Sequence, residues 1–329
     1  MTDMNIIDTI GNTPLVRVNR VLTPEAKANN VRILIKLEMQ NPGGSIKDRI
    51  AKNMLEEAER SGTLKPGMTV VEYTSGNTGI GIAMICAAKG YKCIICMPQL
   101  RSGTLFASYT EDLVGKNEGY FLVNQFFNEA NPSIHYTTTG PEIWKQSGEN
   151  IDYFVTGVGT GGTATGTGKF LCEKNPNCKV ICVEPTESRV HLGAAHTPHT
   201  ILGIGAGVPT HFLTELAPGQ PFAEGSRGHV SEFLSASSSE SIEWATKLAK
   251  TEGIMVGPSS GATLKVAMDL AERPEAKGKT IVVIAASHGI RYTAHPLWKE
   301  MKQEAKTALP QPPNMSKDEG TLFWDSSKA

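Results

Sequence analysis

The chain has 329 residues, of which 40% are hydrophobic and 20% are charged, and its formal net charge is −1 at pH 7. This length accommodates one large domain or two medium ones with a sizeable buried core. The near-neutral charge provides no basic surface for nucleic acid and no acidic tail, which argues against polyanionic partners.

Short β-rich runs alternate with helical segments along the chain, a pattern typical of a parallel α/β architecture. Strands are predicted over residues 32–37, 69–73, 93–97, 120–123, 153–158, 179–183 and 280–285. Helices are predicted over residues 46–61, 79–89, 163–175, 239–251 and 261–271. From about Glu304 the chain becomes polar and proline-rich, which predicts a disordered tail over residues 304–329.

The first loop that indicates chemistry spans residues 41–49 and reads Asn-Pro-Gly-Gly-Ser-Ile-Lys-Asp-Arg. The Pro-Gly-Gly run opposes helix formation, and Ser45 with Asp48 predicts a capping box that begins the next helix. Lys47 then falls in the first turn, where the helix dipole disfavours its ammonium form and favours the amine that forms imines. Taken alone, a lysine in a first turn is usually a solvated surface residue.

The second loop, residues 74–79, reads Thr-Ser-Gly-Asn-Thr-Gly and follows the predicted strand 69–73. Its small residues let successive backbone N–H groups converge at the start of the next helix, which suits an anion such as an α-carboxylate. Asn77 is a candidate to hydrogen-bond a ring hydroxyl. For this loop alone, a polar strand-to-helix turn without any ligand is the competing interpretation.

The third loop, residues 159–163, reads Gly-Thr-Gly-Gly-Thr and also joins a strand to a helix. Glycine allows close approach of a phosphate, and the helix N-terminus supplies donors. The run from Gly157 to Gly162 also matches the dinucleotide-binding pattern G-x-G-x-x-G, and Glu184 ends the next strand about 20 residues further on. The spacing alone therefore allows an NAD-dependent dehydrogenase.

The fourth loop, residues 257–261, reads Gly-Pro-Ser-Ser-Gly and opens a helix. A serine hydroxyl here could face a heterocyclic ring nitrogen, although a helix-capping serine explains the pattern equally well.

Cysteine and histidine spacing does not predict a metal site. Cys93 and Cys96 fall in one predicted strand, where their side chains face opposite ways, so buried thiols in a reducing compartment are favoured. His191, His196 and His199 have no nearby acidic cluster. The most apolar stretch, residues 80–97, is interrupted by charged residues, and the amino-terminal residues carry no apolar core. We expect a soluble, cytoplasmic protein without a membrane segment.

The four loops, in this order, resemble the fold-type II pyridoxal-phosphate enzymes, specifically the cysteine synthase and cystathionine β-synthase family. The resemblance extends from residue 10 to about residue 292 and includes residues 10–15, 125–126, 131–132, 139–144, 183–188 and 203–207. These ordered matches outweigh the dinucleotide interpretation. The resemblance implies a two-lobed, three-layer αβα fold with parallel sheets and a homodimer. A large cofactor-binding lobe would comprise residues 1–41 and 143–303, and a small substrate-closing lobe residues 42–142.

The resemblance also implies a role for each matching residue. Lys47 would form the internal aldimine with pyridoxal 5′-phosphate, Asn77 would bond the cofactor's 3′-oxygen, and Ser259 would face the pyridine nitrogen. The phosphate cradle would be Gly159, Thr160, Gly161, Gly162 and Thr163. The substrate carboxylate would bind at Thr74, Ser75, Gly76, Thr78 and Gln125, and Gly205 would lie in a loop that lines the active site.

The implied chemistry is β-substitution on an amino acid. A neutral serine does not hold the pyridine nitrogen protonated, so the ring is a weaker electron sink and expulsion of a β-leaving group is favoured. With Lys47 as base, O-acetyl-L-serine and sulfide would give L-cysteine by way of an α-aminoacrylate. Synthesis of L-3-cyanoalanine from cysteine and cyanide uses the same loops and remains open.

The chain departs from the family pattern after Pro98. Residues 99–119 are about 20 residues shorter than in the family, which leaves room for one crossover because a full βαβ unit needs roughly 30 residues. We expect one strand and one helix of the small lobe to be missing, a hydrophobic edge strand to be exposed, and closure to be weakened. This departure supports a further hypothesis, in which a catalytically impaired family member binds a protein partner as a sensor.

Overall fold

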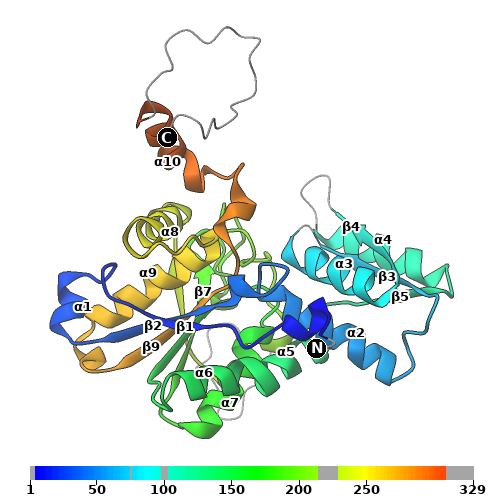
Figure 1. Ribbon diagram of the computed structural model, residues 1–329, viewed down its shortest axis with the longest axis horizontal. Coiled ribbons are helices and arrows are strands. Elements are labelled where there is room, and N and C mark those ends of the chain that lie inside the picture. The colour runs from blue at the N-terminus through cyan, green and yellow to red at the C-terminus, as the bar shows by residue number, and fades with distance from the viewer. Residues whose placement is uncertain (1–3, 75, 98–102, 214–228, 309–329) are drawn as a thin grey trace, which may run out of the picture.

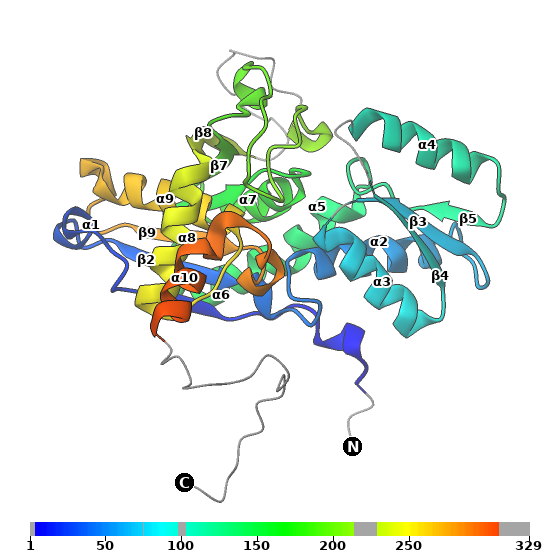
Figure 2. The ribbon, with the colours of Figure 1, turned by 90° about the horizontal axis from the view of Figure 1, so that it is seen from above.

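The computed structural model describes residues 4–74, 76–97, 103–213 and 229–308. Two separate sheets organise the chain. One has six strands in the order β1-β2-β9-β6-β7-β8, and the other has three in the order β4-β3-β5. The two sheets lie in separate lobes, each with its own helices (Figures 1 and 2).

The larger sheet is parallel except at one edge, where β1 pairs with β2 in the antiparallel sense. Its central strands are continuous hydrophobic runs because both faces are covered. The strands are β1 (Leu15–Val18), β2 (Arg32–Leu37), β6 (Tyr153–Gly157), β7 (Lys179–Pro185), β8 (Val230–Ala236) and β9 (Thr280–Ala285).

Helices cover the two faces of this sheet as separate layers, which confirms the predicted three-layer αβα fold (Figure 1). On one face lie α8 (Ser238–Glu252), which begins with a Ser237–Glu240 capping box, and α9 (Pro258–Glu272). On the other face lie α6 (Gly140–Gln146) and α7 (Gly162–Lys174). The short helix α1 (Pro24–Ala28) contacts α9.

The smaller sheet is parallel throughout and consists of β3 (Thr69–Tyr73), β4 (Lys92–Cys96) and β5 (Tyr120–Leu122). Helices α2 (Lys47–Arg60) and α3 (Asn77–Lys89) pack with it in one core. The predicted apolar stripe of α2, Ile50, Met54 and Ala58, is buried in that core.

A single described helix, α4 (Gly103–Gly115), joins β4 to β5, as the one-crossover prediction requires. Strand β4 consequently lies at an edge of the small sheet, and Ile94 and Ile95 on it are only partly buried.

Helix α5 (Ala130–Ile134), followed by a π-helical turn (His135–Thr139), connects the two lobes. It contacts α2 on one side and α7 on the other. The position of α2 relative to the large sheet is therefore supported from both lobes.

Single turns of 3-10 helix and a last α-helix complete the described chain. The turns are Ile6–Thr9, Glu38–Gln40, Val190–Leu192, His211–Leu213, Pro274–Ala276, Gly289–Tyr292 and Pro296–Trp298. Helix α10 (Lys299–Ala308) includes residues 304–308, so the disordered tail was predicted to begin too early. The rest of that predicted tail lies outside the described residues. Within the described residues, no helix is long and apolar enough to cross a membrane.

Candidate active site

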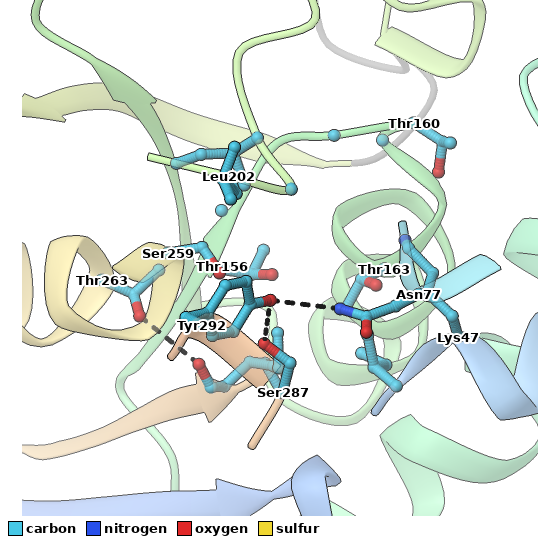
Figure 3. A pocket seen from close by; sticks show the side chains of 18 residues that line it. Lys47, Asn77, Thr156, Thr160, Thr163, Leu202, Ser259, Thr263, Ser287 and Tyr292 are labelled. Atoms are coloured by element: carbon cyan, nitrogen blue, oxygen red, sulfur yellow. Dashed lines mark hydrogen bonds between the residues drawn. The ribbon is translucent and has the colours of Figure 1, made fainter. Parts of the chain in front are cut away.

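A cavity lies where the carboxyl ends of β6 and β9 meet the first turn of α2, and it is lined by residues of all four loops singled out in the sequence (Figure 3). Its lining includes Lys47, Asn77 and Ser259, together with most of the 159–163 loop. An adjoining cavity of about 460 Å³ shares Lys47 and Asn77 and extends over the 74–79 loop. This size falls within the range of small-molecule sites.

Lys47 is the first residue of α2, but the predicted capping box is not formed. The Ser45 hydroxyl accepts the Lys47 backbone N–H at 3.2 Å, while the Asp48 carboxylate accepts the Gly43 N–H at 2.5 Å. The Asp48 side chain therefore holds the preceding turn instead of the helix terminus. Ile46 is the N-cap residue and contributes no side-chain hydrogen bond.

Burial lowers the pKa of Lys47 to about 8. The ammonium form loses its hydration in this position, and no compensating carboxylate lies beside it among the described residues. The side chain points into the cavity, where a larger fraction of the amine is neutral and able to react than on an exposed lysine (Figure 3).

Arg49, two residues further along α2, fixes this turn to the large lobe. Its guanidinium binds Glu38 through Nε at 2.7 Å and Nη2 at 2.8 Å. It also binds Glu142 through Nη1 and Nη2, both at 2.7 Å, and Lys36 donates to Glu142 at 2.7 Å. Arg49, Lys36 and Glu38 are almost fully buried. Bidentate pairing of this kind is geometrically specific, so the network sets the position of Lys47.

Asn77, the first residue of α3, is held by two residues that the sequence analysis did not assign to the site. Its Nδ2 donates to the Tyr292 hydroxyl at 3.2 Å, and its Oδ1 accepts from Arg291 at 2.9 Å. The Tyr292 hydroxyl lies 2.8 Å from the Ser287 Oγ (Figure 3). One N–H of the Asn77 amide remains for an oxygen in the cavity.

The 159–163 loop forms a close-fitting cradle. A Cβ at Gly159 would lie 2.6 Å from the carbonyl oxygen of Gly203, and Gly161 has a φ of +87°. Gly159, Thr160, Gly161 and Thr163 line the cavity. Gly162 packs instead against the amide of Asn131, whose Oδ1 would lie 2.0 Å from a Cβ there.

Ser259 and Ser260, side by side in the first turn of α9, differ in what they contact. The Ser260 hydroxyl accepts the Ala286 N–H at 3.0 Å, so it supports the end of β9. Ser259 lines the cavity with Lys47 (Figure 3).

The adjoining cavity contains most of the predicted carboxylate-binding residues, namely Thr74, Gly76, Thr78 and Gln125. The Thr78 hydroxyl donates to the Oε1 of Gln125 at 2.7 Å. Ser75 lies outside the described residues. Its neighbours present backbone and hydroxyl donors at the N-terminus of α3, an arrangement suited to an anion.

Gly205 supports the lining of this cavity without being part of it. Its neighbours Ile204 and Ala206 line the cavity. The Gly205 N–H donates to the Val158 carbonyl at 3.0 Å, and its own carbonyl lies 3.0 Å from the Nε2 of His199.

The residue that would complete a dinucleotide fingerprint has another role. Glu184 is buried, and its Oε1 lies 2.7 Å from the Nδ1 of His191. The other two histidines of the 191–199 run contact the Ser188 hydroxyl and the Gly205 carbonyl. No cluster of three or more potential metal-ligating side chains occurs in the described part of the chain.

Known proteins resemble the chain over nearly its full length. It matches the family "Pyridoxal-phosphate dependent enzyme" over residues 6–105 and 100–287. It is 41% identical to a cysteine synthase of Staphylococcus aureus over 317 residues, which cover 89% of this chain and 96% of that protein.

Solved structures agree with this similarity. O-acetylserine sulfhydrylase isoform 3 of Entamoeba histolytica is 36% identical, with a TM-score of 0.82 over 91% of this chain and 92% of that one. An O-acetylserine-dependent cystathionine β-synthase of Helicobacter pylori is 30% identical, with a TM-score of 0.80 over 91% and 99% of the two chains.

Proposed function

Because the chain belongs to the pyridoxal-phosphate-dependent enzyme family, we propose that it makes L-cysteine from O-acetyl-L-serine and sulfide. The observation that carries this proposal is the Lys47 amine, whose pKa is lowered to about 8, in a cavity bordered by a glycine cradle and a serine. The relatives named as cysteine synthase and O-acetylserine sulfhydrylase support this choice of substrates.

The residues present fit pyridoxal 5′-phosphate. A Cβ at Gly159, Gly161 or Gly162 would collide with other protein atoms, so the backbone of the 159–163 loop packs closely at the N-terminus of α7, where N–H groups suit a phosphate. The remaining N–H of Asn77 suits the ring oxygen. Ser259 supplies a neutral hydroxyl for the pyridine nitrogen. The bound cofactor supplies the electrophile that acidifies the α-carbon of an amino acid. Lys47 would hold it covalently and, because burial lowers its pKa to about 8, would act as a base at lower pH than an exposed lysine.

The adjoining cavity is proposed to hold the amino-acid carboxylate. Thr78 and Gln125 provide side-chain groups there, and Thr74, Ser75 and Gly76 belong to the same loop at the N-terminus of α3. Backbone N–H groups at a helix N-terminus favour a negative charge. The substrate α-carbon would then lie between this loop and Lys47, which lines both cavities.

The strand distribution supports the proposed lobe boundaries. Strands β3, β4 and β5 all lie within residues 42–142, and all six strands of the large sheet lie within residues 1–41 and 143–303. The homodimer implied by family resemblance is also proposed, and light scattering of the purified protein checks it.

The experiment is a product assay on purified protein loaded with cofactor. We expect cysteine to form from O-acetylserine and sulfide, no detectable product with Lys47→Ala, and unchanged activity with the exposed control Lys65→Ala. Equal activity of Lys47→Ala and the unsubstituted protein would refute the proposal.

A further inference from the structure

A buried carboxyl group lies directly behind the proposed carboxylate subsite. Glu72 is the fourth residue of β3, and its side chain is fully buried. Its Oε1 accepts a hydrogen bond from Nε2 of Gln125 at 3.3 Å, while its Oε2 makes no hydrogen bond of ordinary geometry in the described structure. A buried carboxyl is costly for a strand that otherwise reads Thr-Val-Val-Tyr, so its presence calls for a role beyond packing.

The Gln125 amide is held at both ends. Its Oε1 accepts from the Thr78 hydroxyl at 2.7 Å, and its Nε2 donates to Glu72. In this orientation Thr78 and Glu72 each occupy one end of the amide, and the second N–H of Nε2 is free to donate elsewhere.

The backbone of Gln125 has a separate support. The Asn131 amide donates to the Gln125 carbonyl at 2.8 Å and to the Thr160 hydroxyl at 3.0 Å. This side chain ties the Gln125 loop to the proposed phosphate cradle in the other lobe. Loss of Glu72 should therefore change the orientation of the Gln125 side chain more than the position of the Gln125 backbone.

A carboxyl group can lie behind an anion-binding subsite if it is mostly uncharged. Burial raises the pKa of Glu72 to about 8, although the backbone amides of Asn124 and Gln125 act in the opposite direction. Near neutral pH the group is mostly protonated, so it does not repel an anion bound on the far side of Gln125.

We propose that Glu72 is a positioning residue for the substrate carboxylate, holding the Gln125 amide so that its second N–H donates to that carboxylate. The inference rests on the proposed function, in which Gln125 contacts the carboxylate of O-acetylserine. Glu72 itself does not line the cavity and acts only through Gln125.

The test compares the steady-state kinetics of three variants of the cofactor-loaded protein. Glu72→Leu removes the acceptor, so KM for O-acetylserine should rise by at least about tenfold, as expected for losing one hydrogen bond to a charged group. The KM for sulfide and kcat should stay within about twofold of the values for the unsubstituted protein. The lost contact binds O-acetylserine equally in the ground state and in the transition state, so the chemical step is unaffected. Glu72→Gln keeps an acceptor for the Gln125 amide, so its KM for O-acetylserine should equal that of the unsubstituted protein. Glu57→Gln, an exposed carboxyl in the same lobe, is the control.

A pH profile separates positioning from packing. As the pH passes through about 8, ionisation of Glu72 should raise the KM of the unsubstituted protein, and Glu72→Gln should not show this additional rise. Parallel profiles would overturn the inference, and this comparison also decides the matter if Glu72→Leu does not fold. In a Gln125→Leu background, Glu72→Leu should add little, since coupled residues are not additive.

The possible failures are distinguishable. Normal cysteine production together with an unchanged KM in Glu72→Leu would refute the positioning role alone. Additive effects of Glu72→Leu and Gln125→Leu would refute it as well. No cysteine from the unsubstituted protein would refute the proposed function and the role of Glu72 with it.

Discussion

The chemistry of Lys47 depends on its surroundings, since burial lowers its pKa to about 8 from an ordinary value of 10.5. The rate of covalent attachment of pyridoxal phosphate to the apoprotein should therefore rise with pH and level off above about 8. Cofactor absorbance followed after mixing measures this rate. A rate that continues to rise to pH 10.5 would show an unperturbed lysine.

The same lowered pKa affects stability in a defined direction. Between pH 8 and 10.5 the unfolded chain binds a proton at Lys47 that the folded apoprotein does not. The contribution of this group to the free energy of unfolding should therefore rise with pH across that window. Urea denaturation of the apoprotein and of Lys47→Met, each at pH 8 and at pH 10.5, measures this contribution as the difference between the two proteins.

Ser259 and Ser260 allow a matched comparison of a cavity-lining serine with a structural one. Ser259→Asp should protonate the pyridine nitrogen and reduce kcat by at least about tenfold, because a stronger electron sink no longer favours β-elimination. Ser260→Ala loses the bond to the Ala286 N–H and should cost about 1 kcal/mol of unfolding free energy with little change in kcat. A Ser259→Asp variant with undiminished kcat would contradict this assignment.

Residues in contiguous motifs were predictable from the sequence, and their long-range partners were not. Lys47, Asn77 and Ser259 each belong to a short loop with a recognisable pattern, and the structure brings them to one cavity. Tyr292 and Arg291 bond Asn77 across separations of 215 and 214 residues, which no local pattern reveals. Glu72 was missed for a different reason. It stands within a predicted strand, where its burial behind Gln125 could not be inferred.

At the scale of elements, the first turn of α2 depends on the buried network around Arg49. Arg49→Leu leaves Glu38 and Glu142 without their main partner and should lower the free energy of unfolding by about 3–5 kcal/mol. Arg60→Leu at the other end of α2 breaks only an exposed pair with Glu57 and should cost about 1 kcal/mol or less. Equal losses in urea denaturation would show that the network does not anchor α2.

Gly159, in the cradle between β6 and α7, should tolerate no side chain. Gly159→Ala would place its Cβ 2.6 Å from the Gly203 carbonyl oxygen, a rigid backbone atom. The dissociation constant for pyridoxal phosphate should increase by at least about tenfold, equivalent to 1.4 kcal/mol. Gly119→Ala, where nothing lies within 4 Å, is the control. A Gly159→Ala variant with unaltered cofactor affinity would exclude the loop from the phosphate site.

Strands buried on both faces were predicted with accurate bounds, and the edge strands of the large sheet and the very short helices were not predicted. Strands β2, β3 and β9 were predicted with their observed bounds because they are rich in valine, isoleucine and leucine and are buried on both faces. Strands β1 and β8 form the two edges of the large sheet, and their mixed burial leaves no clear hydrophobic pattern. Helices α1 and α5 have only five residues each, too few to show a helical period.

For the whole molecule, the main question is whether the shortened lobe still works. The described residues between β4 and β5 contain one crossover helix, and β4 is left at an edge. However, the groups proposed to bind the substrate carboxylate come from the loop after β3, the start of α3 and the loop after β5. None of these depends on a strand beyond β4, so we expect an active enzyme.

The visible absorbance spectrum of the cofactor-loaded protein, recorded before and after adding O-acetylserine alone, tests this account most directly. A lysine-bound cofactor band that shifts on addition of the substrate, and returns when sulfide is added, is the predicted result. It would show that a lysine holds the cofactor and that the shortened lobe supports chemistry at the α-carbon. A cofactor band that does not change when O-acetylserine is added would contradict the proposed enzyme. It would favour a catalytically impaired family member that binds a partner.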